Sequence, residues 1–162
     1  DLIKAFEAGV SLFYSASSGS IKRALDGLLA RGAIEVVSVD AGARGRKVYR
    51  ATESGREEFR AWMTGELTGP DAEVSALSRL YFLGLLAPEE RAPVLRRIMA
   101  RIESDLAGLT SLNERLSRQD IPEEYRDVAV HQFATLDYGI AQHRFALDWF
   151  REHLARHAEP EK

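Results

Sequence analysis

A helical repeat of apolar residues marks residues 17–32, which read SSGSIKRALDGLLARG. Ser17 or Ser18 can accept hydrogen bonds from the free amides of a first helical turn, and Gly32 stands where a left-handed residue commonly ends a helix. The apolar positions between them recur at steps of four and three: Ile21, Leu25 and Leu28. This spacing predicts a short amphipathic helix with one apolar face.

The segments around this helix predict one helix before it and a β-hairpin after it. Residues 1–9 carry apolar side chains at helical spacing and end in a glycine, which predicts a short helix. Residues 33–39 and 47–51 are rich in β-branched and aromatic side chains, and the glycine-punctuated residues 40–46 separate them. We therefore expect two short antiparallel strands joined by a turn.

Another helix is predicted directly after the hairpin, in the sequence TESGREEFRAWM. Thr52 and Ser54 open this stretch, and Ser54 and Glu57 have the spacing of a capping box. Its apolar face is formed by three residues: Phe59, Trp62 and Met63. The first part of the chain thus predicts two helices, a hairpin and a third helix.

The second half of the chain has longer apolar repeats. A boundary rich in glycine and proline leads into residues 74–86, VSALSRLYFLGLL, which predict an apolar helix stopped by Pro88. A long helix follows, with a heptad series that only Asp105 breaks: Leu95, Ile98, Ile102, Leu109, Leu112 and Leu116. After residues 119–124 comes a last helix whose stripe alternates steps of three and four: Phe133, Leu136, Ile140, His143, Leu147, Phe150, Leu154 and His157.

The last predicted helix carries aromatic residues off its stripe, namely Tyr138, Phe145 and Trp149. A single packing partner would leave these rings in water, and a second subunit would cover them. We therefore expect a homodimer whose contacts lie along the stripe: Phe133, Leu136, Ile140, His143, Leu147, Phe150 and Leu154. The alternative is a monomeric helical bundle. His143 is expected to be a hydrogen-bonded core histidine, the alternative being a pH-sensitive contact.

Positive charge concentrates in the first third of a chain whose net charge is −3. Residues 1–60 hold ten Lys and Arg against eight Asp and Glu, whereas residues 61–162 hold twelve against seventeen. The predicted turn and second strand read GARGRKVYR, with four cations and no carboxylate: Arg44, Arg46, Lys47 and Arg50. The outward face of the helix in residues 17–32 is also small and basic where it begins, with Lys22 and Arg23.

This order of elements is that of a winged helix-turn-helix, in which the second helix enters the major groove and the hairpin touches the DNA backbone. Cations on an exposed hairpin suit phosphate, because each phosphate neutralised releases condensed counterions. A hairpin tip is also an ordinary place for solvated charge, and the basic helix could be an ordinary surface helix. The two features in succession favour DNA binding.

Composition excludes several other classes of function. The chain has no cysteine and no apolar run near the roughly 20 residues of a membrane span, so we expect a cytoplasmic protein that does not bind membranes. We find no catalytic constellation, phosphate loop or dinucleotide motif, and we predict no enzyme and no cofactor. His153 and His157 have the spacing of a two-histidine metal grip but lack the glutamate of zincins, so we expect solvated histidines and no metal.

Four stretches in order resemble the PadR family of transcriptional regulators, in its longer-chain subgroup with a helical C-terminal domain. SSGSIKRALDGLLARGAIEV is similar to the family's recognition helix running into the wing, and GRKVYRATESGREEFRAWM to the wing and following helix. LSRLYFLGLLAPEER resembles the start of its C-terminal domain, and LDYGIAQHRFALDWFREHL its final helix. With the intervening helix, these stretches cover nearly the whole chain.

The resemblance implies a homodimeric, cytoplasmic, bacterial repressor that binds a palindromic double-stranded operator and is released by a small aromatic or drug-like effector. It implies a mainly α fold, with a winged helix-turn-helix domain in residues 1–64, a linker in residues 65–74 and a three-helix dimerisation domain in residues 75–158. The DNA-binding residues that the resemblance implies lie on the recognition helix and the wing: Ser18, Gly19, Ser20, Lys22, Arg23, Arg46, Lys47 and Tyr49. Arg44 joins them as an expectation from the charge of the hairpin alone.

Two features depart from the family's pattern. After the recognition glycine the family has threonine, an aliphatic residue and tyrosine, whereas this chain has Ser20, Ile21 and Lys22, so its operator cannot be inherited from relatives. The family also has a helix before the one that residues 1–9 resemble, and we expect an N-terminal segment that this numbering omits.

Two further expectations concern partners. Aromatic residues suit an effector pocket for a flat ligand, although an aromatic core is the default interpretation: Phe59, Trp62, Tyr138 and Trp149. The alternative function is a protein-interaction adaptor on a winged-helix scaffold that does not bind DNA.

Overall fold

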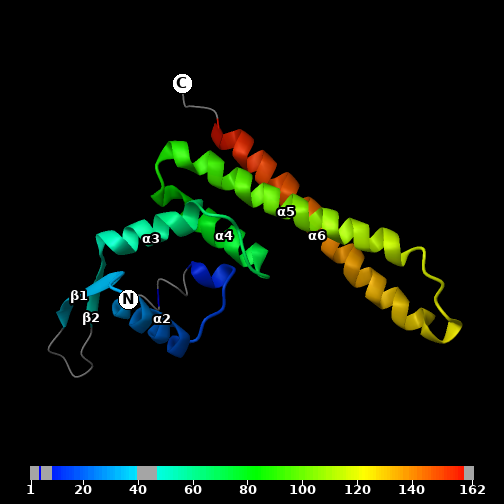
Figure 1. Cartoon of the computed structure of the whole chain (residues 1–162), viewed down its shortest axis with the longest axis horizontal. Helices are drawn as coiled ribbons and strands as arrows, with labels where there is room; N and C mark the ends of the chain where they lie inside the picture. The colour runs from blue at the N-terminus through cyan, green and yellow to red at the C-terminus, as the bar shows by residue number, and fades with distance from the viewer. Residues whose placement is uncertain (1–3, 5–8, 40–46, 159–162) are drawn as a thin grey trace. The chain divides into compact units, whose positions relative to one another are not determined.

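The structure is a computed structural model of the 162-residue chain, and it describes residues 4, 9–39 and 47–158. It is built mainly from helices, with one small sheet (Figure 1). The elements in chain order are η1 (Val10–Leu12), α2 (Ser18–Ala30), β1 (Ile34–Val39), β2 (Lys47–Ala51), α3 (Glu53–Thr64), α4 (Ala72–Phe82), η2 (Leu83–Leu85), α5 (Pro88–Leu116), η3 (Glu123–Tyr125) and α6 (Arg126–Ala158). The predicted fold class is confirmed, with an antiparallel hairpin after helices and long helices at the end of the chain.

Contacts divide the chain into two compact units. The first, here called the winged unit, comprises Asp1–Glu66 and Glu73–Ala87, and the second, the helical unit, comprises Leu67–Ala72 and Pro88–Lys162. The domain bounds given in the sequence analysis stay a prediction, and this grouping places Glu73–Ala87, and with it all of α4 but its first residue, in the winged unit. The physical reason is local, because Arg79 in α4 donates hydrogen bonds to the carbonyl oxygens of Gly65 and Glu66 at the end of α3.

The predicted ends of α2 are confirmed. Ser17 is the N-cap residue, and its hydroxyl oxygen accepts a hydrogen bond from the amide of Ser20 at 3.2 Å. Gly32 follows the C-cap residue Arg31 with φ of +72°, a left-handed conformation that glycine adopts without steric cost. None of the residues of α2 is buried, and its apolar stripe is half-buried: Ile21, Leu25 and Leu28.

The hairpin pairs β1 with β2 in antiparallel register. Ile34 lies opposite Ala51, and Val39 opposite Lys47, with an irregularity between Val36 and Ser38. The extra residue at this point is Val37, which makes a bulge in β1. Residues 40–46, which hold the predicted turn, lie outside the described residues.

The N-terminal cap of α3 differs from the predicted capping box. Thr52, and not Ser54, is the N-cap residue, and its Oγ1 accepts a hydrogen bond from the amide of Gly55 at 3.0 Å. Ser54 lies inside the helix because α3 already begins at Glu53. The three residues of the predicted apolar face differ in burial: Met63 is fully buried, Phe59 is half-buried and Trp62 is exposed.

The sequence predicted one apolar helix over residues 74–86. The structure differs, because this segment is not one continuous helix. α4 ends at Phe82, the 3₁₀ turn η2 follows, and Leu86 adopts an extended conformation. Pro88 does not stop this helix; it begins α5, where its missing amide hydrogen costs nothing because the first amides of a helix have no partner inside it.

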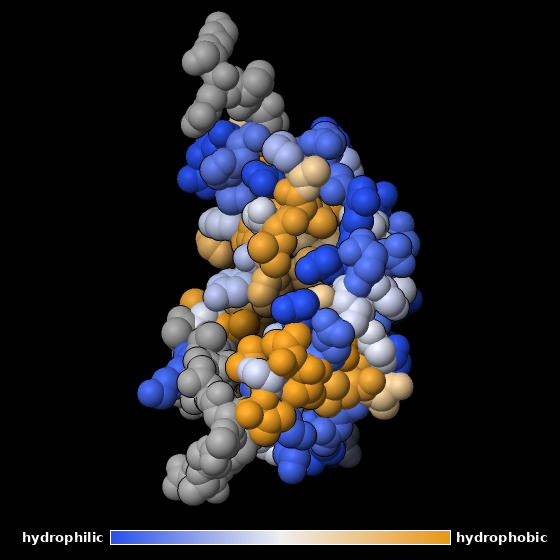
Figure 2. All heavy atoms as spheres, turned by 90° about the vertical axis from the view of Figure 1, so that its left-hand side faces the viewer, coloured by the Kyte–Doolittle hydropathy of each residue, from blue (hydrophilic) through white to orange (hydrophobic). Residues whose placement is uncertain are grey.

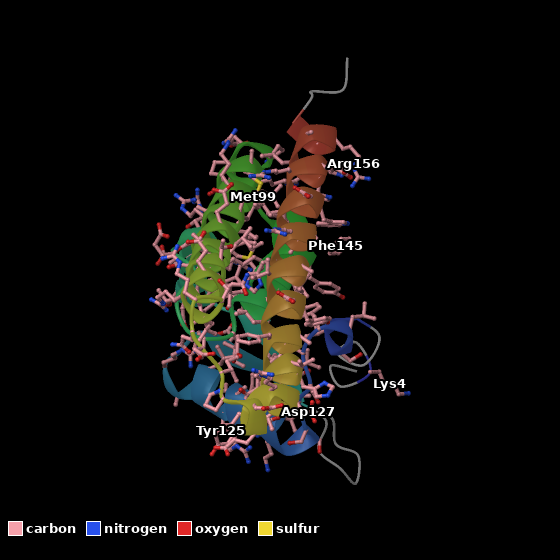
Figure 3. The ribbon with its side chains drawn as sticks, turned by 90° about the vertical axis from the view of Figure 1, so that its right-hand side faces the viewer. Lys4, Met99, Tyr125, Asp127, Phe145 and Arg156 are labelled. Carbon is pink, nitrogen blue, oxygen red and sulfur yellow. The ribbon has the colours of Figure 1, made fainter. Side chains whose placement is uncertain are left out.

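The helical unit is a pair of long helices, α5 and α6, packed side by side (Figure 3). Its core is formed by residues from both heptad stripes: Leu95, Ile98, Ile102, Ile140, Leu147 and Phe150. Asp105, the break in the α5 series, forms an ion pair with Arg101 at 2.9 Å. Among the described helices, none is both long and apolar enough to cross a membrane.

Candidate nucleic-acid interface

The outward face of α2 presents small and basic residues to solvent. Ser18, Gly19, Lys22 and Arg23 are all exposed, while the apolar stripe of the helix faces the other way. Within residues 9–39 and 47–158, neither Lys22 nor Arg23 forms an ion pair. Their charges are therefore available to an anionic partner.

The N-terminus of α2 is fixed by its serines. The Ser20 hydroxyl donates a hydrogen bond to the carbonyl oxygen of Ser17 at 2.7 Å, while its amide donates to the Ser17 hydroxyl. Ser20 was predicted at the groove, and it is half-buried with its hydroxyl proton already engaged in this cap. Ser18 and Gly19 have no such task and offer a small, accessible surface at the helix start.

The hairpin contributes one exposed cation from the described residues that no carboxylate neutralises. Lys47 begins β2 and is exposed, whereas Arg50 is drawn to Glu35 on the paired strand, with Nη1 and Oε1 3.8 Å apart. Tyr49 is half-buried opposite Val36. Arg44 and Arg46, both predicted to bind DNA, lie outside the described residues.

The hairpin also exposes apolar side chains, which the sequence analysis did not single out. Val36, Val37, Val39 and Val48 are all classed as exposed. Figure 2, which views the molecule from the side on which the hairpin lies in Figure 1, shows hydrophobic surface interspersed with hydrophilic residues on that face. The wing is thus not purely basic.

An ion pair between α2 and α3 orients the basic helix. The Arg31 guanidinium binds both carboxylate oxygens of Glu58, with Nε 3.0 Å from each and Nη2 2.9 Å from Oε1. This hydrogen bonding holds the pKa of Glu58 below its usual value and raises that of Arg31. Two parallel bonds fix direction as well as distance, so the pair constrains the end of α2 against α3.

A second constraint is steric and lies at the start of α3. A Cβ added to Gly55 would collide with the carbonyl oxygen of the buried residue Ala33. The amide of Thr52 donates to the same carbonyl at 3.1 Å, so the strand–helix junction packs directly on the turn after α2. Only glycine fits at position 55 in this arrangement.

The predicted effector-pocket residues fall into two sets. In the winged unit, the rings of Phe59 and Trp62 are 6.0 Å apart, and the guanidinium carbon of Arg79 lies 5.5 Å from the centroid of Trp62. In the helical unit, Trp149 stacks on His153 with centroids 5.0 Å apart, and Tyr138 is 69% exposed. The pocket itself stays a prediction.

Part of the predicted dimer stripe on α6 is already buried within this single chain. Ile140, Leu147 and Phe150 are buried, and Phe133, Leu136, His143 and Leu154 are half-buried. His143 is hydrogen-bonded, as expected, with Nδ1 2.7 Å from the carbonyl oxygen of Gly139. Phe145 is 70% exposed and projects away from α5 in Figure 3. Of the off-stripe aromatic residues, Tyr138 and Phe145 are exposed, whereas Trp149 is half-buried.

Two arginines that bind backbone carbonyl oxygens, one in each unit, were missed by the sequence analysis. Arg79 is only 3% exposed and holds Gly65 and Glu66, while Arg101 donates to the carbonyl oxygens of Leu67 at 2.6 Å and Gly69 at 3.0 Å. The signal for Arg79 was available, since it is the one charged residue in the apolar run of residues 74–86.

The rings of the two histidines near the end of α6 lie close together and are tilted by 52° to each other. The centroids of His153 and His157 are 4.5 Å apart. Burial lowers the pKa of His153, as do the nearby His157 and Arg156. The described residues contain no group of three or more His, Cys, Asp or Glu side chains placed to hold a metal ion.

The sequence matches one family model, described as "Virulence activator alpha C-term", over residues 75–158, which is just over half of the chain. No curated protein matches the chain.

The chain is similar to a number of solved structures, among them the following three. Bacillus subtilis PadR in complex with p-coumaric acid is 21% identical, over 98% of this chain and 89% of that one, with a TM-score of 0.44. The same protein in complex with operator DNA is 21% identical, over 94% and 86%, with a TM-score of 0.42. A PadR-like transcriptional regulator from Bacillus cereus is 24% identical, over 94% and 84%, with a TM-score of 0.43.

Proposed function

The chain belongs to the family described as "Virulence activator alpha C-term", which is a PadR-like C-terminal domain, and from this premise we propose that it is a homodimeric DNA-binding transcriptional regulator. The observation that carries the proposal is the outward face of α2. A rigidly capped helix there exposes Lys22 and Arg23, with no ion pair to either in the described part of the chain. We propose that this face enters the major groove of a palindromic operator.

The neighbouring elements suit the same task. Small residues at the start of α2 let the helix approach base edges closely, because Ser18 and Gly19 present little bulk. Lys47 is exposed at the start of β2 and is proposed to contact a phosphate beside the groove, a contact that Arg44 and Arg46 are proposed to extend. Such contacts position the protein without reading sequence, so specificity falls to α2.

The proposal of a homodimer rests on the exposed aromatic side chains of α6. The apolar stripe of α6 already packs on α5. In a monomer, the rings of Tyr138 and Phe145 would stay in water, at 69% and 70% exposure. A second copy of the helical unit would cover them, and pairing two α2 helices on two half-sites raises affinity through effective concentration. The half-buried stripe residues Phe133, Leu136, His143 and Leu154 are proposed to border this interface.

We further propose a cytoplasmic bacterial repressor, released from its operator by a small aromatic or drug-like effector. Each unit by itself offers a flat aromatic surface for such a ligand: the Phe59–Trp62 pair in the winged unit and the exposed Tyr138 in the helical unit. Binding at either surface would have to favour one arrangement of the proposed dimer over another in order to change DNA affinity.

Selection from a random-sequence duplex library tests the function directly. Wild-type full-length protein is expected to enrich a palindromic site, and Lys22→Ala combined with Arg23→Ala should abolish that enrichment. Arg115→Ala with Arg118→Ala removes the same charge from exposed positions of the helical unit and should leave enrichment intact. If the wild type enriched no DNA but retained a stoichiometric protein from a cell lysate, the adaptor function would replace this one.

A further inference from the structure

An acidic side chain shares the outward face of α2 with the cations. Asp26 is exposed and follows Lys22 and Arg23 by four and three positions, a spacing that makes neighbours on a helix surface. The face that results has five members in order: Ser18, Gly19, Lys22, Arg23 and Asp26. At 1.5 Å rise per residue it runs for about 12 Å, enough to span several base pairs along a groove.

Asp26 has no structural task within the described part of the chain. It stands away from the apolar stripe of α2, so it contributes nothing to the core. Although Lys22 and Arg23 are neighbours, neither forms an ion pair with it in residues 9–39 and 47–158. Arg31, the next cation along the chain, is bound through both oxygens of Glu58.

A carboxylate on a DNA-facing surface is costly unless a hydrogen-bond donor faces it. Phosphates repel it, and so do the major-groove acceptors of guanine and thymine. Adenine offers its N6 amino group as a donor, but the neighbouring N7 is an acceptor and repels the second carboxylate oxygen. Cytosine offers its N4 amino group beside a C–H group, so it is the base edge that suits a carboxylate best.

We propose that Asp26 is a specificity-determining residue that selects cytosine in the operator by accepting a hydrogen bond from its N4 amino group. The inference rests on the proposed function, because it assumes that α2 lies in the major groove. Lys22 and Arg23 then bind phosphate and guanine. Asp26, about one helical turn further along α2, determines which base is accepted at its own position. The competing explanation is that the Asp26 charge lowers affinity for all DNA equally.

The two explanations differ in what a neutral side chain does. If Asp26 reads cytosine, Asp26→Ala loses about tenfold discrimination at one position of each half-site. Asp26→Asn, which is nearly isosteric, moves the preference from cytosine to adenine, because an asparagine amide can pair with both N6 and N7 of adenine. If the charge only repels, both variants bind every sequence more tightly and keep the wild-type preference.

The test is selection from a random-sequence duplex library with wild-type protein, Asp26→Ala, Asp26→Asn and Glu57→Gln. Glu57 is an exposed carboxylate on α3 and gives a matched loss of charge in the same unit. Circular dichroism confirms that each variant is folded. A cytosine preference that is lost in Asp26→Ala, shifted to adenine in Asp26→Asn and kept in Glu57→Gln supports the inference. An unchanged base preference in both Asp26 variants overturns the inference about Asp26 and leaves the proposed function standing. A wild-type protein that enriches no DNA overturns the proposed function itself.

Discussion

The hydroxyl of Thr52 donates a hydrogen bond to the carbonyl oxygen of Gly32 across 2.7 Å. The oxygen of the same hydroxyl accepts from the amide of Gly55, so one side chain caps α3 and ties it to the turn after α2. Thr52 therefore links the start of α3 to the residue that follows α2 and its C-cap, in the same unit that carries the basic face.

Thr52→Ala is expected to destabilise the protein by about 1–2 kcal/mol, since it removes a helix cap and leaves the Gly32 carbonyl without this donor. Urea unfolding monitored by circular dichroism measures the change. Ser54→Ala is the matched control, because the sequence pattern suggested Ser54 as the cap whereas the residue lies inside α3. Equal losses for the two variants would show that Thr52 is not the cap.

Gly55→Ala is expected to destabilise the protein by about 1–3 kcal/mol, because the added methyl group meets the Ala33 carbonyl. Alanine otherwise stabilises a helix relative to glycine. Gly27→Ala in α2 is the control: its Cβ would make only ordinary contact with Arg31 at 3.7 Å, and the variant should gain up to about 1 kcal/mol. A gain in thermal stability for both variants would contradict the close approach of α3 to Ala33.

The Arg31–Glu58 pair predicts a pH-dependent contribution to stability. The pKa of Glu58 is lowered in the folded protein, so its contribution is present above the ordinary carboxyl value of 4.5 and is lost as the pH falls through the folded value. Glu58→Gln should therefore be slightly less stable than wild type at pH 7, with the difference disappearing in acid.

Because both side chains are about half exposed, molar salt should also shrink this difference. Glu57→Gln, one position earlier on the same helix, should show neither dependence. Thermal melts across pH 3.5–7.5 at low and high salt provide the comparison. A difference between wild type and Glu58→Gln that persists unchanged in acid would place its origin outside the ion pair.

Phe145→Glu combined with Tyr138→Glu is expected to convert the proposed dimer to monomers, because it places charges on the exposed aromatic face of α6. Sedimentation equilibrium gives the mass. Tyr125→Glu with Val128→Glu changes two other exposed apolar residues near the start of the same helix and serves as the control. A monomeric wild type would favour the intramolecular bundle instead.

The local signals in the sequence predicted most of the winged unit. Ser17, Gly32 and the strands around residues 40–46 were found because caps, left-handed glycines and β-branched runs act within a few residues. The cap of α3 was misassigned because Thr52 and Ser54 are equally good cap residues locally, and the choice depends on the Gly32 and Ala33 carbonyls some twenty positions away.

The heptad stripes predicted which residues of α5 and α6 face a partner helix, but not which helix that is. Ile140, Leu147 and Phe150 fit a dimer seam and an internal seam equally well, and in this chain they pack internally. The hydrogen bonds of Arg79 and Arg101 were missed because their partners are backbone carbonyls, which no residue type marks in the sequence. The place of Arg79 in an apolar run indicated its burial, but not which groups it binds.

The central claim, that α2 carries the DNA contact, is tested most directly by the salt dependence of binding to the DNA site that the wild-type protein selects. Fluorescence anisotropy gives the slope of log K against log salt for wild type, for Lys22→Ala with Arg23→Ala, and for Arg115→Ala with Arg118→Ala. We expect a steep negative slope for wild type, flattened by about 1 for each phosphate that the α2 variant no longer neutralises and unchanged in the control. A wild-type affinity indifferent to salt, or equal flattening in both variants, would contradict the claim.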